Sequence, residues 1–432
     1  MDHTPKTQSL GKWQTPFFAI WTGQAFSLLG SRIVQFALVW WLTELTGSAT
    51  VLATATMVAL APEILLSPIA GAYVDRWNRR IVMIAADTLI ALASLWLAYL
   101  SWTASMQIWH VYVIMLIRAL GGCFHWPAMQ ASTSLMAPNE YLARIAGLNQ
   151  TLNGALSILG PPLGALLMGL LPLHNVILVD VVTAALAIAP LCFVHVPQPR
   201  RADEGAKASS VWRDMQDGMR YVWNWPGLVT LIGAAMIFKV LLTPAFSLMP
   251  LLVSDHFGGR AVQLSLLQSS IGVGVVLGGL TLSVWGGFKR KIYTTMMGMC
   301  VIGVSLVILG LLPGHLFWAA LATVFLMGLT VPMIDGPIMA IFQGTISPEM
   351  QGRVLTLVIS LGSITSPFSL AIAGPVTDWL GIQVWYLAAG LLCSGMGILS
   401  FFVPAIVNIE QNNNGDKVVV PSTAAPITSR NN

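Results

Sequence analysis

Long apolar stretches separated by short polar segments run along almost the whole chain. Each stretch holds about 20 or more mostly apolar residues, the length that a helix needs to cross the roughly 30 Å hydrocarbon core of a bilayer. Because lipid offers no partner to unpaired backbone groups, these stretches must be helices. The pattern predicts an all-α membrane protein with twelve transmembrane helices, at residues 17–43, 50–74, 81–103, 109–133, 145–171, 175–195, 226–252, 263–285, 292–312, 316–340, 354–377 and 383–408.

The 21 Lys and Arg residues are distributed unevenly over the connecting segments. Most of them fall on one side of the twelve-span arrangement, namely in the two termini and in every second loop. An excess of Lys and Arg marks the cytoplasmic loops of membrane proteins. The sequence therefore predicts a multi-pass protein of the cell inner membrane with both termini in the cytoplasm.

The sequence repeats itself with an offset near 210 residues. Pro127-Ala-Met to Pro138 matches Pro337-Ile-Met to Pro348, and the cluster Arg79-Arg80 matches Lys289-Arg290 in the same register. Duplicated helix bundles of this kind are a frequent way of building secondary transporters. We expect two six-helix bundles, at residues 1–195 and 226–408. A cytoplasmic linker at 196–225, with a short amphipathic helix at 211–223, should join them, and a disordered cytoplasmic tail should follow at 409–432.

Composition excludes several classes of protein. The chain is 56% hydrophobic and only 9% charged, against roughly 25% charged residues in soluble domains. It has no basic stripe of the kind that binds nucleic acid, and its four cysteines lie in apolar stretches without paired spacing. It also lacks metal-ligand spacing and a Gly-x-x-x-x-Gly-Lys-Ser/Thr phosphate loop. We therefore expect no enzymatic activity, no metal and no cofactor. We also expect a monomer in the lipid bilayer.

A motif of glycine, acidic and basic residues lies between the second and third spans, with the sequence Gly71-Ala-Tyr-Val-Asp75-Arg76-Trp-Asn78-Arg79-Arg80. It resembles the loop signature of the major facilitator superfamily, with Asn78 where the family usually has glycine. Asn tolerates the left-handed backbone that a tight turn needs. Asp87 follows about two turns into the third span, so we expect it to pair with the basic loop. The alternative is an ordinary positive-inside loop.

Further motifs extend the resemblance along nearly the whole chain. Arg118-Ala-Leu-Gly-Gly122 resembles the Arg-x-x-x-Gly motif of the fourth span, and Gly160-Pro161-Pro162-Leu-Gly164 resembles the Gly-Pro-x-x-Gly signature of drug-proton antiporters. Leu156 and Ala165 stand where that signature has further glycines. Gly and Pro give helices a smooth, bent contact on which two halves could pivot. Ordinary small-residue helix packing is the alternative.

Three more stretches are similar to the macrolide-efflux branch of the superfamily, Ile20-Trp-Thr-Gly-Gln-Ala25, Leu42-Thr-Glu-Leu-Thr-Gly-Ser48 and Phe124-His125-Trp-Pro-Ala128. The resemblance implies a twelve-helix major facilitator fold, alternating access and proton-driven export of hydrophobic compounds. It also implies that spans one, four, seven and ten surround a central cavity. The substrate is left open.

Ionisable side chains within the spans are costly and therefore face a cavity or a partner. Those expected at the central cavity, together with one neighbouring aromatic residue, are Arg32, Arg118, His125, Lys239 and Trp126. We select Glu63 and Asp335 as proton-coupling candidates, because a carboxylate that exchanges a cationic partner for an apolar environment gains and loses a proton. The alternative is a permanent ion pair that holds helices together.

Two other intramembrane groups are open to simpler interpretations. Asp180, near the outer end of the sixth span, is explained by solvation or by a partner on a neighbouring helix. His125 titrates near neutral pH, yet a single histidine is more often a hydrogen-bonded packing residue. The sequence as a whole predicts a proton-coupled exporter of amphipathic, macrolide-like molecules. Export of a siderophore or another endogenous metabolite, and a membrane sensor that moves no ligand, are the alternatives.

Overall fold

The computed structural model describes residues 13–74, 76–194, 196–198 and 211–410. The described residues form an all-helical protein, and the twelve spans expected from the apolar pattern are confirmed by helices long and apolar enough to cross a membrane. The spanning helices are α1 Gln14–Thr46, α2 Ala49–Val74, α3 Arg79–Trp102, α4 Ile108–Met136, α5 Asn139–Leu170, α6 Leu173–Phe193, α8 Pro226–Ser247, α10 Ala261–Trp285, α11 Lys291–Leu311, α12 Phe317–Thr345, α13 Pro348–Leu380 and α14 Ile382–Ser400. The short helices are α7 Val211–Trp223, α9 Met249–Leu251, the π-helix η1 Leu252–His256 and α15 Pro404–Val407.

Several helices differ in length from the apolar runs that predicted them. α5 and α13 begin before their apolar runs, at Asn139 and Pro348, so that polar residues expected in the preceding loops lie within these helices. The last span ends earlier than expected, because α14 stops at Ser400 and Pro404 opens a separate short helix. Hydropathy locates the part of a helix that lies in lipid, whereas the helix itself extends until a cap or a proline ends it.

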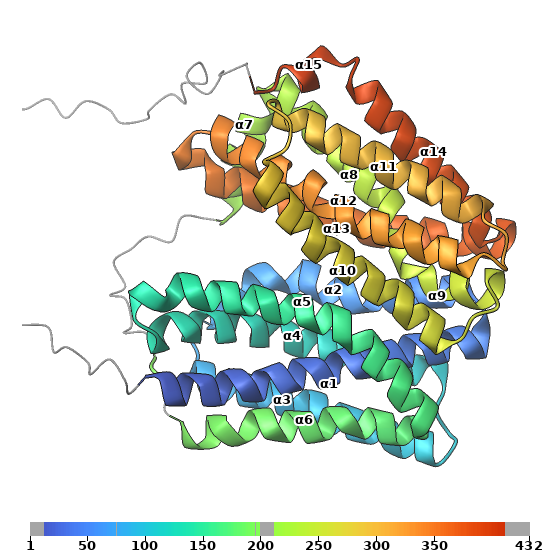
Figure 1. Ribbon diagram of the computed structural model, residues 1–432. Helices are drawn as coiled ribbons and strands as arrows, with labels where there is room; N and C mark the ends of the chain where they lie inside the picture. Colours follow the sequence, from blue (N-terminus) through green and yellow to red (C-terminus); the bar gives the residue numbers. More distant parts are fainter. Residues whose placement is uncertain (1–12, 75, 195, 199–210, 411–432) are drawn as a thin grey trace, which may run out of the picture.

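Helices α1 to α6 pack into one bundle and α8 to α14 into a second, so that the chain consists of two halves (Figure 1). Between the halves, α2 contacts α13 and α5 contacts α10. The helix expected at residues 211–223 is present as α7, and it packs against α13 of the second half. Tyr221 and Val222 of α7 belong to the same buried cluster as residues of α8, α11 and α12.

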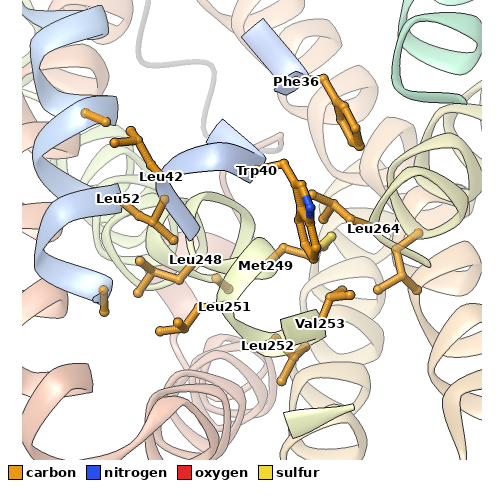
Figure 2. Close-up of a cluster of buried hydrophobic side chains, with 14 of the residues drawn as sticks. Phe36, Trp40, Leu42, Leu52, Leu248, Met249, Leu251, Leu252, Val253 and Leu264 are labelled. Atoms are coloured by element: carbon orange, nitrogen blue, oxygen red, sulfur yellow. The ribbon is translucent and has the colours of Figure 1, made fainter. Parts of the chain in front are cut away.

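The two halves meet at the end of the molecule away from the chain termini, where Figure 1 shows α9 close to the first bundle. The main hydrophobic cluster joins the halves there: Trp40, Leu42 and Leu52 of α1 and α2 face a group of side chains from α8 to α10 (Figure 2). That group contains Leu248, Met249, Leu251, Leu252, Val253 and Leu264. The remaining clusters each lie within one half, so apolar burial holds the halves together mainly at this end.

A carboxylate adds to the same contact. Asp378 of α13 accepts hydrogen bonds from the backbone N–H groups of Ala49 and Thr50, at 2.6 and 3.0 Å, and from the hydroxyl of Ser48 at 2.9 Å. The second half thus caps the first turn of α2, where free N–H groups and the helix dipole favour an anion. One turn earlier, a Cβ on Gly374 would lie 2.9 Å from the Cα of Thr50, so the two backbones touch. We call this contact the outer latch, because the orientation predicted from Lys and Arg places this end of the molecule outside the cell.

The first two residues of the tail that we expected to be disordered, Ile409 and Glu410, are packed against the second half. Ile409 is fully buried, and the Glu410 carboxylate accepts a hydrogen bond from the backbone N–H of Ile292 at 2.9 Å. The first turn of α11 is therefore capped from the C-terminal segment. Residues 411–432 lie outside the described part of the chain, so the prediction for them is not addressed.

Candidate functional site

A cavity of about 600 Å³ lies within the second half. Its wall combines aliphatic, aromatic and methionine side chains with two charged ones, Lys239 of α8 and Asp335 of α12. The larger apolar side chains of the wall are Leu231, Phe238, Leu242, Phe246, Ile292, Met296, Met299, Ile302, Ile334, Ile338, Met339, Phe342 and Ile406. An apolar hollow with a few polar groups is the usual form of a small-molecule site.

Lys239 and Asp335 face this cavity from opposite helices. Both side chains are exposed rather than packed, and the charge of Lys239 acts on Asp335. Among the described residues neither forms an ion pair or a side-chain hydrogen bond. A Cβ on Gly362 of α13 would lie 3.5 Å from the Lys239 Nζ, so the missing side chain leaves room for the ammonium group. The pair is thus available to a ligand.

Glu63, the other proton-coupling candidate, lies elsewhere. It lines a separate hollow of about 290 Å³ between α2 and α4, together with Trp126 and Cys123. Of the described residues, no cation lines this hollow. The structure therefore places the two candidate carboxylates in different halves, each with different surroundings.

Arg118 does not line the cavity, contrary to the prediction. It points into the first half and forms an ion pair with Asp180 of α6, which is only 1% exposed. Asp180 also accepts hydrogen bonds from Ser31 at 3.0 Å and from Ser94 at 2.8 Å, and Arg118 donates to the backbone oxygen of Ser31. We call these four residues the Arg118 network. Of the two interpretations of Asp180, solvation is wrong and a helix partner is correct.

Asp87 and His125 also differ from the prediction. Asp87 is 4% exposed and pairs with neither Arg79 nor Arg80. It accepts a hydrogen bond from the side-chain amide of Gln24 at 3.0 Å, and its Oδ1 lies 3.5 Å from Nε2 of His125. His125 is 7% exposed and faces the bundle interior instead of a central cavity. The reason is geometric: α1, α3 and α4 meet at this level, so the three side chains face one another.

The basic loop finds other partners. Arg79 is buried and donates to the backbone oxygen of Ala131 at 2.8 Å, while Arg80 donates to the backbone oxygen of Cys192. These bonds tie the start of α3 to α4 and α6. Asn78 accepts from the N–H groups of Arg80 and Ile81 with φ −69°, so it is an extended N-cap and not a left-handed turn residue.

The rest of the gate motif is only partly described. Arg76 is exposed, and Gly71 lies in α2. Asp75 lies outside the described residues. The expected gate role of this motif therefore stays a prediction.

The glycine–proline motif of α5 lies against its own half. A Cβ on Gly160 would lie 3.0 Å from the Cβ of Arg32, and one on Gly164 would lie 2.8 Å from Cδ1 of Phe36, so both glycines belong to the packing of α5 on α1. Pro161 follows Gly160 inside α5. The expected position between the halves is wrong. The α5–α10 contact uses Ser269, whose hydroxyl donates to the backbone oxygen of Ile158 at 2.7 Å.

Arg32 is exposed on α1 beside Gly160 and lines neither the cavity of the second half nor the hollow at Glu63. The structure thus brings Lys239 and Asp335 together but places Arg32, Arg118 and His125 apart from them. Sequence reasoning missed Gln24 and Asp378. The signal for Asp378 was weak: Ser48 and Thr50 indicate a helix start near residue 49, but nothing indicates that the capping group comes from the other half.

Comparison with known proteins places the chain in a family. The family model described as Major Facilitator Superfamily matches residues 20–357. Macrolide efflux protein A of Streptococcus pyogenes is 34% identical over 403 residues, which cover 93% of this chain and 99% of that protein. Multidrug efflux pump Tap of Mycolicibacterium fortuitum is 26% identical over 396 residues, covering 88% and 94%.

Solved structures agree in fold. A peptide transporter POT matches with a TM-score of 0.68 at 13% identity, covering 91% of this chain and 95% of that one. A bacterial homologue of the iron transporter ferroportin matches with a TM-score of 0.63 at 15% identity, covering 91% and 99%. The twelve helices in two bundles, the extent of the family match and the full-length likeness to efflux proteins lead to one conclusion: the chain belongs to the major facilitator superfamily and is a multi-pass membrane transporter of small molecules.

Proposed function

We propose that this protein is a proton-coupled exporter of amphipathic, macrolide-like small molecules that works by alternating access. The observation that carries the proposal is the cavity of the second half, which combines a large apolar wall with Lys239 and Asp335. A hydrophobic ligand with a basic amine would bury its apolar surface against this wall and place its cation beside Asp335. The likeness to macrolide and multidrug efflux proteins supports the same substrate class.

The arrangement of the halves supports alternating access. Apolar packing and the outer latch join the halves at the end away from the termini, and the ribbons diverge toward the termini (Figure 1). With the termini in the cytoplasm of the cell, as the distribution of Lys and Arg favours, this arrangement is the state that receives its substrate from inside. Export then requires the outer contact to open and the opposite ends to close.

Proton coupling follows from competition at a carboxylate. When Asp335 is ionised it binds a cationic ligand or interacts with Lys239, and when it takes up a proton from outside it releases the ligand. Glu63, in its separate hollow, is the second candidate for proton uptake. The Gly71–Arg80 loop is proposed as the cytoplasmic gate, and one chain is proposed to suffice for transport.

The test is efflux of erythromycin from an efflux-deficient host. We expect cells that carry the protein to accumulate less drug, and a protonophore to abolish the difference. Asp335→Asn and Glu63→Gln should each abolish gradient-driven efflux, whereas Glu44→Gln, an exposed carboxyl at the outer end of α1, serves as the matched control. Efflux that withstands the protonophore contradicts proton coupling, and normal efflux in both variants removes these carboxylates from the mechanism.

A further inference from the structure

The first half contains a buried acid and a buried titratable base that face each other and have no role in the cavity of the second half. We infer that Asp87 and His125, held by Gln24, form a proton-binding site of their own. We call these three residues the inner triad. The inference rests on the proposed proton-coupled transport and adds to it a proton site remote from the ligand.

The geometry of the inner triad suits a proton. The side chains come from three helices, α1, α3 and α4, and are 0%, 4% and 7% exposed for Gln24, Asp87 and His125. Nε2 of His125 is buried without a hydrogen-bond partner and lies 3.5 Å from Oδ1 of Asp87. A buried polar atom without a partner is costly. A proton bound at Nε2 gives the imidazole a donor for this carboxylate, so uptake and a small approach of the two side chains relieve the cost.

Gln24 is the positioning residue of the triad. Its amide nitrogen donates to Oδ2 of Asp87 at 3.0 Å, and its amide oxygen is buried without a partner. A side-chain amide carries both a donor and an acceptor and does not titrate. It therefore fixes the carboxylate whether or not the pair holds a proton.

A small cavity lies directly beside the triad. A cavity of about 20 Å³ is lined by Trp21, Met83 and Met129, each one helical turn from a member of the triad on its own helix, and by Ser132 and Thr133. One water molecule needs about 10–15 Å³, so the cavity has room for one. It lies on the side of the triad that leads toward the chain termini, where α4 ends at Met136. We infer that the proton leaves through this cavity.

The charged side chains on the helices around the triad have other partners or lie apart from it, so none of them forms a fixed ion pair with Asp87 or His125. On α3, Arg79 is bonded to Ala131 of α4. On α4 and α6, Arg118 and Asp180 neutralise each other about two turns away. On α2, the nearest acid is Glu63, whose charge acts on Cys123 of α4. The α6 atoms closest to α1 at this level are apolar or backbone, from Leu186 to Pro190.

The Arg118 network shows what a permanent pair looks like in the same bundle. α1, α3 and α4 contribute to both groups at positions seven residues apart, which is about 10 Å along each helix. The network occupies the level of Ser31, Ser94 and Arg118, and the triad that of Gln24, Asp87 and His125. A guanidinium does not lose its proton in proteins, whereas an imidazole exchanges one near neutral pH. Of these two groups, therefore, the inner triad is the one that can carry a proton through a cycle.

The proton balance of one cycle is simple. In the state open to the outside, the pair of ionised Asp87 and neutral His125 takes one proton from external water, an N–H bond forms at Nε2, and the charge of the pair changes from −1 to 0. In the state described here, that bond breaks and the proton passes to water on the side of the termini. The inward movement of this proton supplies energy for outward movement of the ligand.

The test uses the purified protein in liposomes, with radiolabelled erythromycin as the probe. Transport is measured twice, once driven by an imposed pH gradient and once as exchange of erythromycin across the membrane without a gradient. We expect Asp87→Asn and His125→Gln to lose gradient-driven transport by about tenfold or more, the usual size of a coupling between two ligands, while exchange stays within about twofold. Asp180→Asn is the matched control: we expect it to weaken the Arg118 network, so both modes should fall together.

The outcomes separate the two proposals. A wild-type protein that ignores the pH gradient contradicts the proposed function. A wild-type protein that responds to the gradient, together with Asp87 and His125 variants that respond equally, overturns only the inner triad. A parallel loss of both modes in these variants also overturns it, because that result marks a structural role.

A second measurement observes His125 directly and leaves the inner triad unchanged. The chain has 7 histidines, so NMR of histidine-labelled wild-type protein gives few imidazole signals, and replacement of the other histidines assigns that of His125. We expect the His125 signal to change when the pair takes up a proton from a more acidic buffer, and to change when erythromycin is bound. A His125 signal that responds to neither overturns the proposal.

Discussion

The two halves share a scaffold but fill it differently. His125 stands two residues before Pro127 in α4, and Asp335 stands two residues before Pro337 in α12, so they occupy the same place in the repeat. In the first half this position is buried against Asp87, whereas in the second half it faces a cavity of about 600 Å³. The two halves therefore share a helix arrangement, and side-chain identity decides that this position is packed in the first half and open to a cavity in the second.

This difference suggests that the two halves have different tasks, the first as a rigid support and the second as the binding half. The Arg118 network joins side chains from four helices of the first half, and such a network holds helices in one arrangement, so the first half is suited to be the more rigid partner. A wall rich in methionine and phenylalanine repacks around ligands of varied shape, so the second half is suited to binding. The following predictions test this contrast, beginning with the largest expected effect.

Removal of the acid from the Arg118 network should damage the first half severely. Asp180→Ala leaves the Arg118 guanidinium buried without its carboxylate, and breaking a buried pair in this way costs about 3–5 kcal/mol. We expect a large drop in thermal stability and in yield, measured by melting of the purified protein. Replacing both members by apolar residues, Asp180→Leu with Arg118→Met, should recover much of the loss. Equal damage in the single and double variants would show that the charge imbalance is not the cause.

Filling the cavity of the second half should weaken binding without loss of stability. Ala235→Phe places a ring in the hollow beside Lys239, and we expect the KM for erythromycin transport to rise about tenfold, the effect of a misfitting apolar group in a pocket. Ala119→Phe makes the same change in the smaller hollow beside Glu63 and should leave KM nearly unchanged. An equal rise in both variants would contradict the assignment of binding to the second half.

The smallest effect is expected at the outer latch, where the halves meet. Asp378→Ala removes the cap from the first turn of α2, worth about 1 kcal/mol, which shifts the population toward an open outer end about fivefold. Labelling of a cysteine introduced at Leu52, which is 2% exposed, by an impermeant maleimide reports this opening. Asp378→Asn retains one acceptor oxygen, so we expect its labelling rate to lie between those of the wild-type protein and Asp378→Ala. Labelling that does not change in Asp378→Ala would show that apolar packing alone closes this end.

The sequence predicted the fold well because the bilayer imposes a simple rule. Apolar length and loop charge located twelve helices, and the repeat indicated two bundles. Helix ends were predicted less well: α5 and α13 extend past their apolar runs, because caps and prolines end a helix whereas hydropathy marks only its buried part.

The site was predicted only in part. Lys239 and Asp335 were selected because a charged side chain within the bilayer is costly, and both line the cavity of the second half. The partners of Arg118, His125 and Asp87 were not, since they depend on how each helix is rotated about its axis. A rotation of about 100° per residue separates a cavity-facing position from a core-facing one, and helices that are apolar all round carry little information about that angle. Gln24 carried no signal for the same reason, because an amide among apolar residues shows its role only once Asp87 is beside it.

The outer latch has a consequence for how this family can vary. Its acceptor is one carboxylate, but two of its three donors are main-chain N–H groups of Ala49 and Thr50, which nearly any amino acid would supply equally well. Substitutions along that turn of α2 are therefore tolerated so long as they bring no proline and no bulk against Gly374, whereas position 378 is constrained. In distant relatives, we expect an acidic residue at the end of the eleventh span, α13, to be retained even where the sequence of the segment that it binds has changed.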